Sequence, residues 1–291
     1  MTAIARNPAI QRSLLFLPGN RERFLEKAAA LDADGFIVDL EDSVPDAEKA
    51  AARKCLATYA PVLRGKAIWV RPNAPGTRHF EEDLAVICGT PGVRGLLLPK
   101  AETVPALRAA DDLIGGYESA AGLSRGTIKL ILTIESALGV RRAIDLLTAI
   151  GRTETLCFGG ARDGDLMTDL GCEWSNLGGT LEHARAFSLV AARAAGCRYP
   201  LDGVFADIDD LAGFEQDTSR SRSLGYCGRT LIHPSQIEPA NRLYRPTLRE
   251  IAEQEFISPN TVKTHVRNIY RKLGVSDRDS VTAAAHALGI E

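Results

Sequence analysis

The sequence predicts an α/β protein: a TIM (β/α)8 barrel with a small C-terminal all-α, helix-turn-helix-like appendage. Short apolar runs alternate with longer segments in which apolar residues recur every three or four positions. This alternation indicates buried strands followed by amphipathic helices. Eight such strand–helix units in roughly 240 residues match a TIM barrel in number and size. The character of the sequence then changes after residue 246, where the appendage is expected.

The predicted strands are apolar throughout and do not alternate with polar residues, which is typical of strands buried on both faces of a parallel sheet. In chain order they cover residues 13–18, 35–42, 67–73, 95–100, 128–135, 155–160, 201–207 and 228–234. The helical period falls between them, for example in 21–32, 46–60, 105–120 and 138–151. A doubly wound open sheet is the alternative fold. It would usually have fewer strands and a Gly-rich first turn, and FLPGNRERF at the end of the first strand is not G-x-G-x-x-G.

The appendage has its own helix signals. Ser258 followed by Pro259 indicates an N-cap with proline at the first helical position, and Gly274 is placed for the C-cap. Between them, apolar residues at i, i+4, i+7 and i+11 predict one buried stripe, which consists of Val262, Val266, Ile269 and Leu273. Shorter amphipathic segments over 247–256 and 277–290 flank this helix. The order resembles a helix-turn-helix, whose second helix can enter a major groove.

Two prolines, Pro239 and Pro246, bracket a predicted linker. We therefore expect a barrel domain over residues 1–243 and a helical domain over residues 244–291.

The composition narrows the functional classes. The net charge is −2, with 45% hydrophobic and 25% charged residues, so the chain as a whole is not built to coat nucleic acid or an anionic membrane. Six cysteines without a C-x-x-C pair indicate reduced thiols and neither a disulfide framework nor a zinc site. No apolar run approaches 18 residues, and the N-terminus lacks the apolar core of a signal peptide. We expect a cytoplasmic protein without a membrane partner.

Charged residues gather where the predicted strands end, at the rim that holds TIM-barrel active sites. These residues are Asp39, Glu41, Asp42, Arg71, Lys100, Glu135, Asp163 and Asp165. Two carboxylates from neighbouring strands, such as Glu135 and one of the later aspartates, suit Mg²⁺, which completes its coordination with water and substrate oxygens. An arginine across the pocket can hold a substrate carboxylate or the charge that develops on an enolate. Together these groups favour carbon–carbon bond making or breaking next to a carbonyl.

Seven motifs occur in order along the barrel segment: RSLLFLPGNRERFLEKA, DLEDSVPDAEKAAAR, VRPN, LPKAET, TIESALGV, FGGARDGDLMTDLG and IHPSQIEPAN. Their order and approximate spacing resemble those of the HpcH/HpaI aldolase/citrate lyase family. The similarity spans about residues 12–243 and is greatest to citrate lyase beta-subunit-like proteins that act on acyl-CoA substrates. The resemblance implies a TIM barrel, Mg²⁺ as cofactor and a homo-oligomer, a trimer or hexamer.

The resemblance also implies site residues. Glu135 of TIES matches one metal ligand. Asp165, six residues before Gly171, matches the second, with Asp163 as the alternative. Arg71 matches the arginine that contacts the keto-acid or thioester oxygen.

Four further residues match positions that bind substrate. Glu41 and Asp42 resemble family residues near the metal and its waters, although an acid here can also cap the next helix. Arg12 and Lys27 match positions associated with the CoA end of the site. Solvated or salt-bridged surface cations are the alternative interpretation of these two residues.

The segment IAEQEFISPNTVKTHVRNIYRKLGVSDR resembles the LuxR-type DNA-binding domain. That resemblance assigns a DNA-facing side to Lys263, Thr264, His265, Arg267 and Asn268, and phosphate contacts to Arg271 and Lys272. The first helix of a complete domain of this type has no room here. The usual C-terminal extension of the barrel family, which supplies an acidic residue to a neighbouring active site, has no counterpart. The segment therefore either binds DNA or packs as a structural appendage.

The predicted function is that of a Mg²⁺-dependent carbon–carbon lyase of the citrate lyase beta-subunit type. It would cleave a 3-hydroxyacyl-CoA, such as malyl-, citramalyl- or citryl-CoA, into an acyl-CoA and a 2-keto acid, or catalyse the reverse reaction. One alternative is an aldolase that acts on free 2-keto-3-deoxy acids. The other is a DNA-binding transcription regulator whose barrel senses a CoA ester or keto acid.

Overall fold

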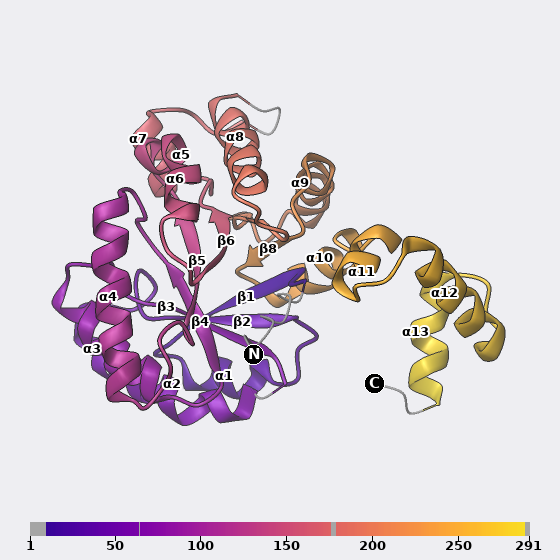
Figure 1. Cartoon of the computed structure of the whole chain (residues 1–291), viewed down its shortest axis with the longest axis horizontal. Coiled ribbons are helices and arrows are strands. Elements are labelled where there is room, and N and C mark those ends of the chain that lie inside the picture. Colours follow the sequence, from indigo (N-terminus) through magenta and orange to yellow (C-terminus); the bar gives the residue numbers. More distant parts are fainter. Residues whose placement is uncertain (1–9, 64, 176–178, 289–291) are drawn as a thin grey trace. The chain divides into compact units, whose positions relative to one another are not determined.

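The computed structural model describes residues 10–63, 65–175 and 179–288 (Figure 1). The chain divides after Tyr244 into two compact units, a barrel and a C-terminal helical unit. Each unit is described by itself.

The barrel unit is a closed sheet of parallel strands in the order β1 to β8, with β8 paired to β1. This arrangement confirms the predicted fold class. The strands are β1 (Ser13–Pro18), β2 (Gly35–Asp39), β3 (Ala67–Arg71), β4 (Val93–Leu98), β5 (Lys129–Ile134), β6 (Thr153–Phe158), β7 (Leu201–Asp202) and β8 (Gly228–Leu231). Most of the predicted strands extend past their observed ends, for example by three residues in β2 and by five in β7. Residues 40–42 and 203–207 lie beyond the ends of β2 and β7, in loops at the rim.

Helices surround the strands, as Figure 1 shows. They are α1 (Glu22–Ala28), α2 (Lys49–Tyr59), α3 (Arg78–Gly89), α4 (Val104–Ala120), α5 (Ala137–Arg141), α6 (Ala143–Thr148), α7 (Asp165–Leu170), α8 (Thr180–Ala194), α9 (Leu211–Leu224) and α10 (Ile237–Leu243). Several begin at side-chain caps, for example at Thr103 and Ser136, whose hydroxyls accept a backbone N–H of the first turn. Each cap fixes where a rim loop becomes a helix.

Two apolar layers hold the barrel together. Side chains that point inward from alternate strand positions fill its interior; they include Leu14, Ile37, Trp69, Leu97, Ile131, Cys157 and Leu201. The larger cluster lies between the strands and the helices. Because strand residues are buried on both sides, the predicted strands contain almost no polar alternation. The interior is therefore a packed core, and chemistry is confined to the rim.

The predicted linker was partly wrong. Pro239 lies buried in the first turn of α10, a position where a helix tolerates proline because the first N–H groups have no intrahelical partner. The connection between the units begins only after Tyr244.

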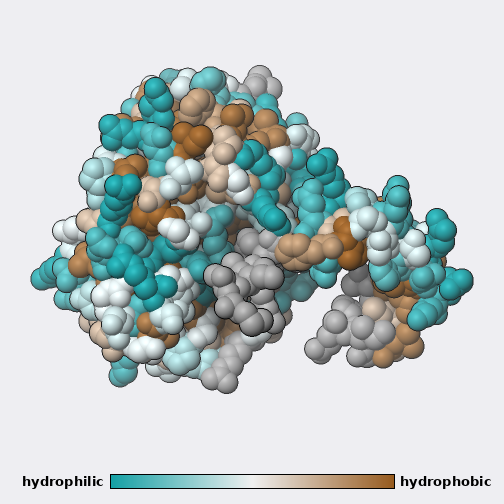
Figure 2. Space-filling view, in the orientation of Figure 1, coloured by the Kyte–Doolittle hydropathy of each residue, from teal (hydrophilic) through white to brown (hydrophobic). Residues whose placement is uncertain are grey.

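The C-terminal unit contains α11 (Leu248–Gln254), α12 (Pro259–Leu273) and α13 (Arg278–Ala287). As predicted, the Ser258 hydroxyl caps α12 by accepting the N–H of Thr261, and Gly274 ends it with φ of 67°. The predicted buried stripe is only partly correct. Val262 is buried, whereas Ile269 is 45% exposed, because three short helices offer little surface to cover it. Figure 2 shows apolar residues at the surface of this unit beside mostly hydrophilic ones. Among the described residues, no helix is long and apolar enough to cross a membrane.

Candidate active site

Arg71 ends strand β3 and is held at the rim by two acids, one at the end of β2 and one in the loop after it. Its Nε and Nη2 donate to the two carboxylate oxygens of Asp39 at 2.7 and 2.8 Å, and Nη1 donates to Asp42 at 3.2 Å. The guanidinium carbon lies 4.9 Å from the ring centroid of Phe16. Burial alone would raise the pKa of Asp39, but hydrogen bonds and charge from Arg71 outweigh it and lower that pKa. These bonds use three of the five N–H donors of Arg71, so a substrate oxygen can bind the same guanidinium.

Glu41 lies beside this pair, with its Oε2 3.5 Å from Arg71 Nε. The buried Lys49 fixes its backbone, since Lys49 Nζ donates to the carbonyl oxygens of Leu40 and Glu41 at 3.0 and 2.8 Å. Burial raises the pKa of Glu41 to about 8, because the opposing effect of Arg71 is too small and nearby acids add to the shift. The Glu41 carboxyl therefore holds a proton at neutral pH in the metal-free protein.

Glu135 follows β5, two strands along the barrel from the strand of Arg71. Its Oε1 accepts the backbone N–H of Lys100 at 2.7 Å. Burial raises the pKa of Glu135 to about 6, despite that bond and the charge of Arg71. Ser136, the next residue, caps α5, so the chain turns sharply and leaves Glu135 at the strand end.

The structure brings one of the two candidate aspartates to Glu135. Asp165 opens α7, its Oδ2 lies 3.7 Å from Lys100 Nζ, and its charge contributes to the raised pKa of Glu135. Asp163 instead points to Arg162, at 3.7 Å, and its side chain is 80% exposed. The geometry favours Asp165 as the partner of Glu135.

Together these groups form an acid cluster. Within the described part of the chain it contains two cations, Arg71 and Lys100, and five carboxylates: Asp39, Glu41, Asp42, Glu135 and Asp165. Two of the carboxylates have a raised pKa because their burial is not offset by positive charge. The cluster thus fits a divalent cation, which would supply that charge. Among the described residues, no three or more His, Cys, Asp or Glu side chains are arranged so that they could together hold a metal ion. Such a cation would depend on two protein carboxylates and on water, as Mg²⁺ often does.

Two predicted substrate residues do not reach this cluster. Arg12 precedes β1 and therefore lies at the opposite end of the barrel, where its guanidinium binds Asp34 at 2.6 and 2.8 Å and the carbonyl oxygen of Asn241 at 3.3 Å. Lys27 is exposed in the last turn of α1, which runs from the rim toward that opposite end. Both residues therefore lie away from the acid cluster, and their predicted role at the CoA end of the site stays a prediction. Both residues belong to the motif RSLLFLPGNRERFLEKA, which covers β1 and α1. Such a strand–helix unit spans the full height of the barrel, so the two ends of the motif lie away from the rim.

Sequence reasoning did not assign Phe16 or Asp39 to the site. Phe16 is one apolar residue within an apolar strand, so only the strand register shows that its ring lies under Arg71. Asp39 was recognised as a strand-end acid, but its bidentate pairing depends on the neighbouring position of Asp39 and Arg71 in β2 and β3.

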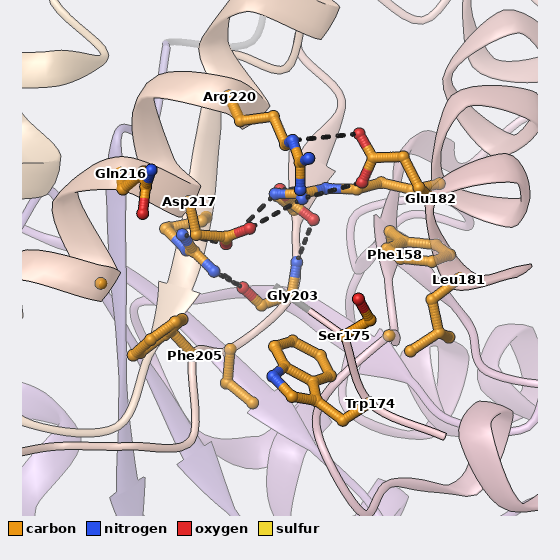
Figure 3. Close-up of a pocket in the computed structure, with 16 residues that line it drawn as sticks. Phe158, Trp174, Ser175, Leu181, Glu182, Gly203, Phe205, Gln216, Asp217 and Arg220 are labelled. Atoms are coloured by element: carbon orange, nitrogen blue, oxygen red, sulfur yellow. Dashed lines mark hydrogen bonds and ion pairs between the residues drawn. The ribbon is translucent and has the colours of Figure 1, made fainter. Parts of the chain in front are cut away.

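A cavity of about 340 Å³ lies between α8 and α9, beside the ends of β6 and β7 (Figure 3). Trp174 and Phe205 lie on the side opposite Glu182 and Arg220. None of the described residues that line it belongs to the acid cluster.

A buried ion network forms the charged wall of this cavity. Arg185 pairs with Asp202 and Asp217 at 2.9 Å, and Arg229 pairs with Asp217 at 3.0 Å. Burial would raise the pKa of Asp217, but Arg229 and Arg185 outweigh it and lower that pKa. Because these charges neutralise one another, the acid cluster is the better candidate for catalysis.

Comparison with known proteins decides the family. Residues 12–234 match the HpcH/HpaI aldolase/citrate lyase family, which is well over half of the chain. The chain belongs to the HpcH/HpaI aldolase/citrate lyase family. It is therefore an enzyme, a lyase of this family. Residues 247–285 match the luxR family of bacterial regulatory proteins, which confirms the resemblance of the C-terminal unit.

Individual relatives cover most of the chain. Citrate lyase subunit beta of Leuconostoc mesenteroides subsp. cremoris is 34% identical over 84% of this chain and 80% of that protein. L-malyl-CoA/beta-methylmalyl-CoA lyase of Cereibacter sphaeroides is 31% identical over 83% of this chain and 81% of that protein. Among solved structures, citrate lyase beta subunit of M. tuberculosis, complexed with oxaloacetate and magnesium, is 31% identical with a TM-score of 0.66, covering 82% of this chain and 98% of that one.

Proposed function

We propose that this family member is a Mg²⁺-dependent carbon–carbon lyase that cleaves or forms a 3-hydroxyacyl-CoA of the malyl, citramalyl or citryl type. The products of cleavage would be an acyl-CoA and a 2-keto acid. The acid cluster carries the proposal, because it places two buried acids of raised pKa, Glu41 and Glu135, beside an oriented arginine. The relatives support the substrate class: one is named for citrate, one for malyl-CoA, and a solved M. tuberculosis relative is complexed with magnesium, acetoacetate and coenzyme A.

Each residue has a proposed role. Glu135 and Asp165 would hold Mg²⁺, which supplies Lewis-acid polarisation of the keto-acid carbonyl. Arg71 would donate to a substrate oxygen on which negative charge develops, and Asp39 keeps its guanidinium plane fixed. Glu41 and Asp42 would bind water or substrate hydroxyl groups beside Arg71.

A substrate panel tests the proposal. Metal-free protein is incubated with and without Mg²⁺ and with malyl-, citramalyl- or citryl-CoA, and released keto acid is measured as its phenylhydrazone. Free thiol is measured in parallel, because another relative, from Cereibacter sphaeroides, is a (3S)-malyl-CoA thioesterase, 34% identical over 82% of this chain. Keto acid without free thiol supports the lyase. Free thiol without keto acid would contradict the lyase and indicate a thioesterase. Turnover of free 2-keto-3-deoxy acids alone would favour the aldolase.

A second function rests on the luxR match and on the surface of α12. This helix contains no acidic residue, and Lys263, Arg267, Arg271 and Lys272 are exposed on it. Of the other predicted DNA contacts, Thr264 is exposed, while Asn268 accepts a hydrogen bond from Arg271 at 3.2 Å. We propose that this face binds DNA, with the barrel as the sensor of a CoA ester or keto acid. Salt-dependent DNA binding that such a ligand shifts would support it.

A further inference from the structure

Lys100, which follows β4, contacts both carboxylates assigned to the metal. Its backbone N–H donates to Glu135 Oε1 at 2.7 Å, and its Nζ lies 3.7 Å from Asp165 Oδ2. The backbone contact orients Glu135, and the side-chain contact pairs an ammonium with Asp165.

The backbone of Lys100 adopts an uncommon conformation. Its φ is 54°, in the left-handed region that disfavours residues with a Cβ. Glycine would adopt this conformation without strain and would present the same N–H to Glu135. The backbone role therefore does not explain a lysine at this position, and the explanation must lie in its side chain.

The surroundings of the ammonium are strongly acidic. Burial alone would lower the pKa of Lys100, but the charges of Glu41, Asp165, Asp42 and Glu135 outweigh it and raise that pKa. The side chain is 50% exposed, so it can turn into water without losing a packed position. Arg71, the other cation of the cluster, is bound to Asp39 through two hydrogen bonds and lacks this freedom.

We propose that the Lys100 ammonium is the counter-cation of Glu135 and Asp165 in the metal-free enzyme and that Mg²⁺ displaces it. The inference rests on the proposed function, which assigns Mg²⁺ to the same two carboxylates. Lys100 thereby weakens the binding of Mg²⁺ alone. A bound keto acid adds negative charge, with which the displaced ammonium can pair, so metal and substrate strengthen each other's binding.

The test measures the Kd of Mg²⁺ by calorimetry on the metal-free full-length protein, with Mn²⁺ and electron paramagnetic resonance as a second readout. In Lys100→Met, Mg²⁺ should bind about tenfold more tightly, because a like charge beside the two carboxylates has been removed. Lys100→Arg keeps a cation and should stay within about twofold of the native Kd. Oxaloacetate should strengthen Mg²⁺ binding in the native protein and strengthen it much less in Lys100→Met. An unchanged or weaker Mg²⁺ affinity in Lys100→Met overturns the inference.

Lys100→Gly and Lys100→Ala separate charge from backbone strain. Both variants lose the ammonium, but only glycine relieves the positive φ. The inference expects equal Mg²⁺ affinity in the two, with a higher Tm for Lys100→Gly. Affinity that instead follows Tm would assign the effect to the backbone and overturn the inference. If the native protein binds Mg²⁺ and Lys100→Met binds it no more tightly, only the role of Lys100 is contradicted. If neither binds Mg²⁺, the proposed Mg²⁺ site falls as well.

Discussion

At the scale of single residues, the acid cluster is defined by unequal burial of like groups. Asp39 is buried and fully paired, Glu41 and Glu135 are buried with little compensation, and Asp165 is 61% exposed beside Lys100. Similar carboxyl groups therefore differ in how readily they release a proton and bind a cation.

Alanine variants of Asp165 and Asp163 should show which of the two aspartates binds Mg²⁺. Asp165→Ala should weaken Mg²⁺ binding by at least about 100-fold, since even an indirect metal partner contributes 10–100-fold. Asp163→Ala is the matched control and should stay within about twofold, because its side chain points to Arg162. Calorimetric titration with Mg²⁺ measures both. The reverse pattern would move the metal site to Asp163.

Arg71→Lys should lower kcat/KM by about 100-fold, because an ammonium cannot bind Asp39 and substrate through one planar group. Steady-state kinetics with the accepted CoA ester measures the loss, with Tm as the control for folding. Near-native turnover would remove Arg71 from the mechanism.

Glu41 should make the stability of the metal-free protein depend on pH. Its folded pKa, about 8, lies above the ordinary value of 4.5, so its contribution to stability is complete below 4.5 and is lost as pH rises through 8. Glu41→Gln cannot ionise. Its Tm should therefore rise relative to the native protein between about pH 5 and pH 9, by at least about 3 °C. Differential scanning calorimetry in EDTA measures this difference, and a constant difference across that range would contradict the assigned pKa.

At the scale of elements, strands and caps were more predictable than the rim. Uniform apolar runs identify strands buried on both sides, and the Ser258 and Gly274 signals mark both ends of α12. The runs 35–42 and 201–207 were too long. In the first run no Gly or Pro marks the point where pairing stops, and in the second Gly203 was included in the strand although pairing stops before it. The clustering of strand-end charges followed from parallel topology. Which carboxylates are compensated, and the left-handed backbone of Lys100, depend on contacts between different strands and have no local sequence signal.

Helix α12 should account for any DNA binding. Lys263→Ala and Arg267→Ala should each reduce the slope of log K against log salt by about one, for one lost phosphate contact. Arg249→Ala is the control, because this α11 cation pairs with Glu253 at 3.1 Å. Fluorescence anisotropy over a salt series measures the slopes. If the native protein binds DNA no more tightly than it binds heparin at low salt, the regulatory function is excluded.

At the scale of the whole molecule, the barrel unit is complete by Tyr244. Asn241 donates to the carbonyl oxygen of Asp32 at 2.7 Å and its side-chain oxygen accepts from Ser13 at 2.7 Å, so α10 is bound to the start of β1. Tyr244 is fully buried, and its hydroxyl lies 2.5 Å from that of Ser221. These contacts, all within the barrel unit, bind α10 to the barrel.

Truncation after Pro246 should therefore leave the Tm of the barrel within about 2 °C and its lyase activity unchanged, while DNA binding is lost. Calorimetry, kinetics and anisotropy on the truncated chain test the three parts. A large fall in Tm, or a change in oligomeric state, would show that the C-terminal unit supports the barrel.

The ion network beside the cavity has an evolutionary consequence. Arg185, Asp202, Asp217 and Arg229 are two positive and two negative groups that compensate one another in a buried place. Loss of Arg185 takes away the ion-pair partner of Asp202, and loss of Asp217 takes away that of Arg229; a buried charge left in this way costs about 3–5 kcal/mol, whereas joint replacement by apolar residues can be nearly neutral. Arg185 and Asp217, which link the other two, can therefore hardly change singly, so neutral drift at these two positions must pass through rare paired substitutions.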